Sequence, residues 1–174
     1  WQTLTAGSGD IWISDLSRKT FTRLSFSGNA SSPVWSADGK TIYYVYIDPN
    51  GAKTTIMRKP ADGSRDAESI VVLETRAFLK AVTADGAFAI LDYANPSTAG
   101  RESDVVKLPL VASAKPERLV SSRFDDYAGV WSPDGRWLAY VAREPGRGKL
   151  EVYVRPFPGS GGRWQVSSDG GDNP

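Results

Sequence analysis

The sequence predicts an all-β fold, a β-propeller segment assembled from four-stranded antiparallel blades. Three observations predict it. Two motifs recur along the chain in step, each repeat divides into four short strand-like runs, and the second run of each repeat is rich in apolar residues on both of its faces. Small sheets arranged radially, each packed between two neighbours, account for all three.

The first motif is an apolar residue, often Trp, followed by Ser or Thr, a spacer, Asp-Gly and an apolar run. Its three copies are SPVWSADGKTIYYVY (32–46), LKAVTADGAFAILDY (79–93) and AGVWSPDGRWLAYVA (128–142). Their aspartates, 47 and 49 residues apart, are Asp38, Asp85 and Asp134. The second motif begins at residues 10, 55, 104 and 151, with spacings of 45, 49 and 47 residues. Periods of this length indicate stacked or radial repeats. The middle copy is degenerate, because Val82 stands where the others have Trp35 and Trp131.

The third repeat shows how each unit divides into strands. Its four runs are residues 128–132, 136–142, 150–156 and 163–167. Asp-Gly between the first two predicts a tight turn, because Gly135 tolerates positive φ and Asp134 can accept hydrogen bonds from nearby amides. In the second run, alternate residues face opposite sides, and both sets are apolar. A sheet with one solvated face would alternate apolar and polar residues, so we expect these sheets to be covered on both sides.

Residues 65–82 carry a competing pattern. Their apolar residues fall at near-helical spacing, which taken alone indicates a helix. The β-branched run 70–72 favours a strand, and the repeat register places a fourth strand, a loop and a new first strand here. We therefore expect strands in this segment.

Counting strands predicts three full blades plus three strands of another. The division by residue number is an incomplete blade at 1–31 and blades at 32–78, 79–127 and 128–174. The chain starts with Trp1, and its single methionine, Met57, is internal. We expect an excised part of a six- to eight-bladed ring; a four-bladed ring that lacks one inner strand is the alternative.

Composition excludes several kinds of chemistry. The 174 residues are 40% hydrophobic and 24% charged, with net charge +1 and neither histidine nor cysteine. This balance gives no bulk attraction to nucleic acid, and no apolar run is long enough to insert into a membrane. Ser-His-Asp and Cys-His catalysis and His or thiolate metal sites are excluded. We expect no cofactor, no metal and no catalytic residue in this segment.

The repeated strings resemble a known family. SPVWSADGKTIYYV and AGVWSPDGRWLAYVA, each with DIWISDL or EVYVRPF nearby, look like the WD-like β-propeller repeat of the TolB family. Residues 151–174 are similar to the propellers that follow the kinase domain in bacterial eukaryotic-like Ser/Thr protein kinases. The resemblance implies rings that bind proteins, peptides or small ligands, and it extends to the propellers that guard prolyl-oligopeptidase-type peptidases. It also implies a periplasmic or extracytoplasmic location.

Motifs that imitate active sites have structural explanations. The Asp-Gly pairs lack the intervening residue of an Asp box, so we interpret them as turns. GSGG (159–162) lacks the following Lys-Ser/Thr of a phosphate-binding loop. Neither a G-x-S-x-G nucleophile elbow nor a kinase motif is present.

The loops that join each fourth strand to the next first strand converge on one mouth of the ring. They are residues 25–32, 74–80, 121–128 and 167–174. The third loop combines charged and aromatic side chains suited to a peptide or polar ligand. The predicted contact residues are Arg76, Phe78, Arg123, Phe124, Asp125, Asp126 and Tyr127. Two alternatives stay open: a cation held by the paired aspartates, or solvated loop residues with local pairing.

We therefore expect a non-catalytic binding module for a protein, peptide or small ligand, within a longer protein such as a bacterial Ser/Thr kinase. The alternatives are the gating propeller of a prolyl-oligopeptidase-type peptidase and a TolB-like periplasmic envelope protein.

Overall fold

The computed structural model describes residues 2–5, 8–98, 102–120, 122, 125–143, 149–159, 161–172 and 174. Within these residues, fifteen strands form four antiparallel sheets, and the one helical element is a short 3-10 turn at Pro96–Thr98. The predicted all-β class, with three four-stranded sheets and one three-stranded sheet, is confirmed.

Each sheet follows the order of the sequence. The partial blade contains β1 (Gln2–Thr5), β2 (Ser8–Asp15) and β3 (Thr20–Arg23). The first complete blade contains β4 (Ala30–Trp35), β5 (Thr41–Ile47), β6 (Thr54–Pro60) and β7 (Glu68–Leu73). The second contains β8 (Ala77–Val82), β9 (Phe88–Ala94), β10 (Ser103–Pro109) and β11 (Glu117–Val120). The third contains β12 (Asp126–Trp131), β13 (Trp137–Arg143), β14 (Leu150–Pro156) and β15 (Trp164–Gln165).

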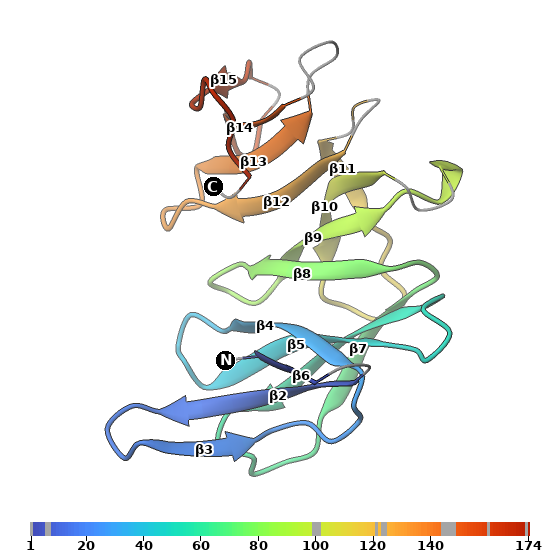
Figure 1. Cartoon of the computed structure of the whole chain (residues 1–174), viewed down its shortest axis with the longest axis vertical. Helices are drawn as coiled ribbons and strands as arrows, with labels where there is room; N and C mark the ends of the chain where they lie inside the picture. The colour runs from blue at the N-terminus through green and yellow to red at the C-terminus, as the bar shows by residue number, and fades with distance from the viewer. Residues whose placement is uncertain are drawn as a thin grey trace.

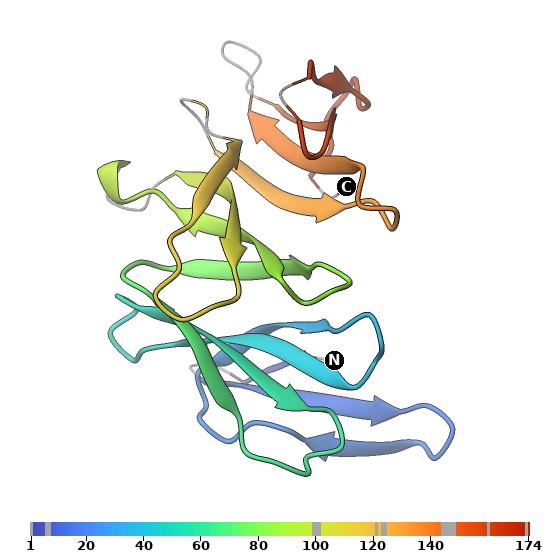
Figure 2. The ribbon, with the colours of Figure 1, turned by 180° about the vertical axis from the view of Figure 1, so that it is seen from behind.

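The four sheets succeed one another along the long axis of the molecule (Figures 1 and 2). The first strands of successive complete blades, β4, β8 and β12, contact one another. The partial blade and the third blade lie at opposite ends, so the sheets form an open arc and the alternative of a closed four-bladed ring is not observed (Figure 1).

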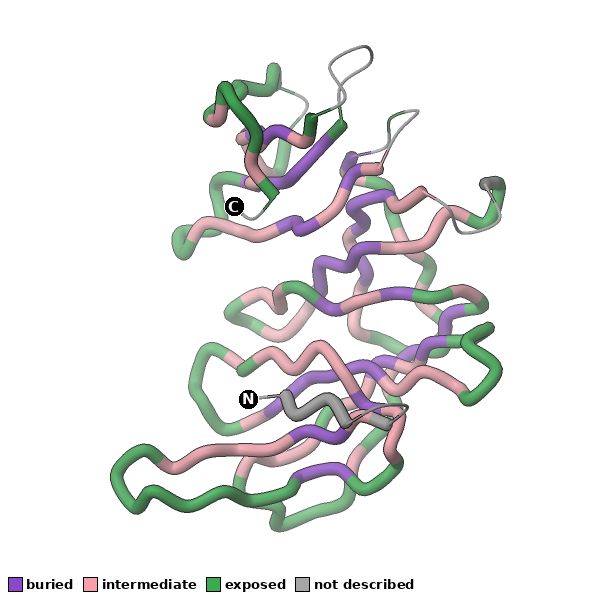
Figure 3. Tube along the Cα trace, in the orientation of Figure 1, coloured by how far each residue is buried: buried purple, intermediate pink, exposed green. Residues whose placement is uncertain are grey.

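A separate apolar cluster fills each junction between blades. Ile42 and Tyr44 of β5 pack against Ile11 and Leu24 of the partial blade. Tyr43 and Val45, on the other face of β5, belong to the cluster shared with the second blade. A third cluster joins β9 and β10 to β13 and β14. Burial therefore follows the middle strands of the sheets, whereas the turns are mostly exposed (Figure 3). The second strands are buried on both faces, as their sequences predict.

The junction between the second and third blades is unusually close at Gly129. A Cβ atom at this position would lie 2.6 Å from Val105 Cγ1 and 3.0 Å from Ile90 Cγ2. Real Cβ atoms do not approach other atoms this closely, so β12 packs directly over the second blade only because residue 129 has no side chain.

The three Asp-Gly turns share one hydrogen-bond pattern. The hydroxyls of Ser36, Thr83 and Ser132 donate to the turn aspartates at 2.6, 2.6 and 2.5 Å. The same Oδ1 atoms accept from the amide two residues later, at 3.0–3.1 Å. The glycines that follow have φ of 69°, 70° and 69° and are Gly39, Gly86 and Gly135. The interpretation of the Asp-Gly pairs as turn elements is confirmed.

The strands in residues 65–82 and the starts of the first strands bear on two predictions from the sequence. Residues 65–82 contain β7 and β8 rather than a helix, so the repeat register predicted this segment correctly. The first strands begin at Ala30, Ala77 and Asp126, two residues before the expected repeat units. Each contains a bulge in its pairing with the second strand, which extends the ladder toward the preceding loop.

Candidate functional site

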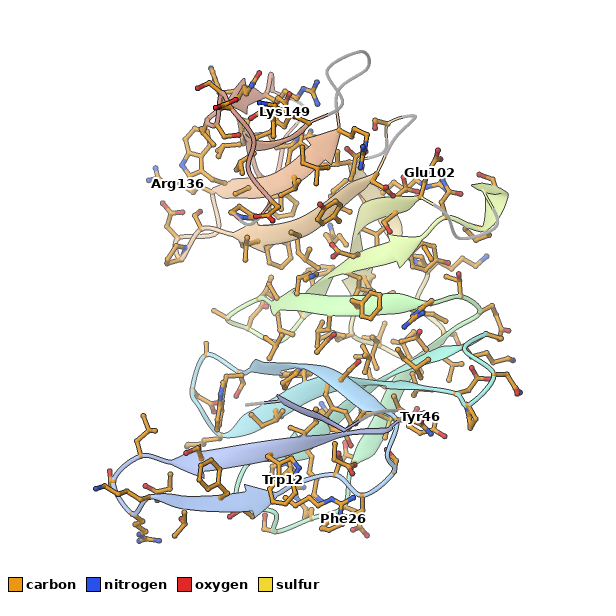
Figure 4. The ribbon with its side chains drawn as sticks, viewed as in Figure 1. Trp12, Phe26, Tyr46, Glu102, Arg136 and Lys149 are labelled. Atoms are coloured by element: carbon orange, nitrogen blue, oxygen red, sulfur yellow. The ribbon has the colours of Figure 1, made fainter. Side chains whose placement is uncertain are left out.

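The loops and turns of the arc lie on two opposite edges. The turn edge carries the Asp-Gly turns, and the mouth edge carries the loops that lead into each first strand. Arg136, which follows the third Asp-Gly turn, and Glu102, which precedes β10, lie on opposite sides in Figure 4. The sequence places the contact residues on the mouth edge.

On the mouth edge, Arg76 and Phe78 lie together at the start of β8. The guanidinium carbon of Arg76 is 5.1 Å from the centroid of the Phe78 ring, a cation–π distance. Phe78 and Tyr127 occupy equivalent positions in adjacent first strands, opposite Asp92 and Val141 of their own sheets. The register shows that the two positions are equivalent, and the proximity of their side chains stays a prediction.

Two of the predicted contact residues accept hydrogen bonds from backbone amides. Asp125 Oδ1 accepts a hydrogen bond from the amide of Ser103 at 3.1 Å, which links the third-blade loop to the second blade. Asp126 is fully buried, and its Oδ2 accepts from the amide of Ser122 at 2.7 Å. Burial raises the pKa of the Asp126 carboxyl above its usual value. This carboxyl group supports the loop and is not on the surface.

Tyr127 is half-buried, and burial raises the pKa of its phenol. Arg123 and Phe124 lie outside the described residues.

No group of three or more acidic residues in the described part of the chain is arranged to hold a metal ion. No described helix is long and apolar enough to cross a membrane.

A cavity of about 510 Å³ opens on the turn edge. Its lining comes from the ends of three successive first strands, from the turns that follow them and from Phe157 after β14. The principal apolar residues are Trp35, Ala81, Val82, Trp131, Pro133 and Phe157. This volume falls in the range of sites that hold small ligands or short peptide segments.

The cavity lies at the degenerate position of the repeat. Trp35, Val82 and Trp131 all end their first strands, and they pair with Ile42, Ala89 and Leu138 of the second strands. Trp131 packs against Phe157 with ring centroids 5.1 Å apart, whereas Trp35 is 50% exposed. The Phe157 contact lies within the third blade, and Trp131 also packs against the cluster shared with the second blade. Packing therefore accounts for Trp131 but only in part for Trp35.

The charge of the cavity comes from two turn aspartates, Asp85 and Asp134. The Thr83 hydroxyl holds the pKa of Asp85 below its usual value, and the Ser132 hydroxyl lowers that of Asp134 to about 2. Arg136 Nε lies 2.7 Å from Asp134 Oδ2. Asp85 has no ion-pair partner among the described residues, and no lysine or arginine belongs to the described cavity lining.

The sequence signal for this cavity was the missing tryptophan at position 82. The tryptophans at the equivalent positions of the two neighbouring blades, Trp35 and Trp131, form walls of the same cavity, which the sequence alone does not show. The sequence placed binding on the mouth edge because the mixture of charged and aromatic side chains is denser there.

Comparisons with known proteins agree with this fold. No protein-family model matches the chain. A dipeptidyl-peptidase 5 of Trichophyton equinum is 32% identical over 133 aligned residues, which cover 66% of this chain and 18% of that protein. The chain thus spans less than a fifth of that curated relative.

Solved structures show the same architecture. A prolyl endopeptidase matches with a TM-score of 0.62 at 16% identity, over 92% of this chain and 26% of its own. The β-propeller domain of the Trilobed protease from Pyrococcus furiosus matches with a TM-score of 0.57 at 15% identity, over 95% of this chain and 52% of its own. The chain is therefore a β-propeller segment, similar in fold to the propellers of peptidases.

Proposed function

We propose that this chain is a non-catalytic, peptide-binding β-propeller segment of a longer protein, and that the longer protein is a peptidase. The observation that carries the proposal is the match over 95% of the chain to a propeller domain of a protease. The sequence similarity to a dipeptidyl-peptidase, over a small part of that protein, supports the same context.

The residue types of the chain support a binding role. Peptide hydrolysis by a serine or cysteine nucleophile requires a general base, which is usually histidine. The sequence has no histidine, no cysteine and no G-x-S-x-G elbow. A peptidase that contained this chain would carry its nucleophile and base on other residues, and the propeller would select or admit the substrate.

None of the proteins named above is a kinase, so the kinase context remains a prediction from the resemblance of residues 151–174. The TolB-like envelope role and the extracytoplasmic location likewise remain predictions.

The coding sequence around this chain tests the proposed context. We expect a serine-hydrolase domain with a G-x-S-x-G elbow on the C-terminal side. A kinase catalytic domain on the N-terminal side, or a secretory signal with no enzyme domain, would contradict the peptidase context and support one of the other two. The purified chain should release no product from fluorogenic peptides, and turnover that persists through repurification would contradict the non-catalytic role.

A further inference from the structure

We propose that the turn-edge cavity at Val82 binds a peptide segment that presents a bulky apolar side chain next to a lysine or arginine. This inference rests on the binding function proposed above, and it assigns that function to the turn edge. Neither the sequence motifs nor the relatives assign a site there.

The shape of the cavity follows from one departure from the repeat. Tryptophan ends the first strand in the first and third blades, but valine ends it in the second. The smaller side chain leaves a slot between Trp35 and Trp131, with Ala81 and Phe157 also in its lining. A bulky apolar side chain of a ligand would occupy the space that the repeat otherwise gives to an indole.

The exposed indole of Trp35 provides a binding surface. Its residue is 50% exposed although it lies at the end of a sheet strand. Large aromatic surfaces that become buried on binding contribute strongly to affinity, and they also attract cations to their faces. A ligand in the slot would cover this ring.

A second departure in the same repeat leaves the cavity with an unneutralised negative charge. The residue two positions after the turn aspartate is Lys40 in the first blade and Arg136 in the third, but Ala87 in the second. Asp85 Oδ1 accepts hydrogen bonds from Thr83 Oγ1 at 2.6 Å and from the Ala87 amide at 3.0 Å. In the described part of the chain, no cationic side chain pairs with Asp85 and no hydrogen bond reaches its Oδ2.

These two departures define the ligand. Loss of the indole makes room for an apolar group, and loss of the basic residue leaves Asp85 to attract a cation. The lining comes from three neighbouring blades, so the ligand has to be long enough to contact all of them. A short peptide satisfies the requirement better than a single side chain or a small amine.

The first test is binding of four capped tetrapeptides to the purified chain, measured by isothermal titration calorimetry. The peptides are Gly-Trp-Lys-Gly, Gly-Trp-Gln-Gly, Gly-Trp-Glu-Gly and Gly-Ser-Lys-Gly, each N-acetylated and C-amidated. We expect the Trp-Lys peptide to bind at least about fivefold more tightly than the Trp-Glu and Ser-Lys peptides. Its affinity should fall with rising salt, because the ion pair at the rim is screened.

Substitutions that restore the repeat provide the second test. Val82→Trp should fill the slot and weaken binding by more than about tenfold. Ala87→Lys should neutralise Asp85 and remove the preference for lysine over glutamine. Both replacements introduce residue types found at the equivalent positions of neighbouring blades, so thermal unfolding should show an intact fold.

Removal of the charge is a third test. Asp85→Asn should weaken binding about threefold. The matched control, Asp38→Asn, alters the same turn position outside the cavity lining and should have no effect on binding.

Three results would overturn the inference: equal affinity for the Trp-Lys and Trp-Glu peptides, undiminished binding by Val82→Trp, or no binding of any peptide. Binding of free tryptamine as tightly as the Trp-Lys peptide would overturn the assignment to a peptide. The peptidase context is decided separately by the coding sequence, so failure at this site would be distinguishable from failure of that context.

Discussion

Lys80 and Asp92 form an ion pair across the first two strands of the second blade, with 3.0 Å between Lys80 Nζ and Asp92 Oδ2. The Asp92 side chain is 8% exposed. Burial raises its pKa, although the charge of Lys80 acts in the opposite direction. The strand register places Val45 and Val141 at the equivalent positions of the neighbouring blades. The buried carboxylate of Asp92 therefore stands where the neighbouring blades have a valine.

Removing the lysine of this pair should cost more stability than replacing the aspartate. We expect Lys80→Ala to destabilise the chain by about 1–3 kcal/mol, because it leaves a buried carboxylate without its countercharge. Asp92→Val restores the repeat residue and should be neutral or stabilising. Urea unfolding at pH 7 checks both variants. The reverse order of stabilities would show that the ion pair itself stabilises the junction.

Asp126 should make stability depend on pH. Because its pKa in the folded state is raised, the folded chain retains a proton at pH values where the unfolded chain has lost it. The contribution of Asp126 to the free energy of unfolding is largest below the pKa of about 3.9 that an aspartate has in an unfolded chain. This contribution is lost as the pH rises through the pKa of the folded state. The unfolding midpoint of Asp126→Asn should lack this component when compared with the unmodified chain between pH 4 and pH 8. Parallel pH profiles for the two proteins would be inconsistent with a buried titrating carboxyl at this position.

The Asp-Gly turns should differ in their tolerance of a side chain. Gly135→Ala places a Cβ in open space but at φ of 69°, so we expect a loss of about 1 kcal/mol from backbone strain. Gly86→Ala has nearly the same φ, and its Cβ would also lie 3.1 Å from Tyr43 Oη, so the loss should be larger. Denaturant midpoints give the comparison, with Gly162→Ala as a control in open space without positive φ. Equal losses at positions 86 and 135 would mean that Tyr43 moves aside freely.

The close junction at Gly129 should respond to added volume. Gly129→Ala should destabilise the chain by about 1–3 kcal/mol, because its Cβ would clash with Val105 and Ile90 across the blade interface. The clash is tested by a double-mutant cycle with Val105→Ala, which removes the nearest atoms. We expect the second substitution to be less harmful in the Gly129→Ala background than alone. Strict additivity would contradict a direct clash.

The spacing of the repeats predicts most of this fold, because each blade repeats the same turn and strand motifs. The Asp-Gly turns, the two-faced second strands and the strands in 65–82 all follow from the register. The periodicity of that segment taken alone indicates a helix, and the register corrects it because packing between sheets outweighs local propensity.

The candidate site was less predictable, because it depends on which residues of different blades meet. Asp126 reads as a loop residue, but bulged pairing extends β12 to include it and buries its carboxyl group. In the sequence, Val82 is only a departure from the tryptophan that the other two repeats have at this position. That Trp35 and Trp131 form opposite walls around it depends on the radial arrangement of the blades, which one repeat by itself does not specify.

The shared hydrogen bonds of the three Asp-Gly turns have a consequence for how such a protein can diversify. The hydroxyl, the aspartate and the glycine hold the hairpin together by themselves, and the second blade keeps this pattern without the tryptophan or the basic residue of its neighbours. The turn itself therefore does not depend on those two positions. Evolution can vary them blade by blade and acquire new recognition properties while the scaffold beneath stays unchanged.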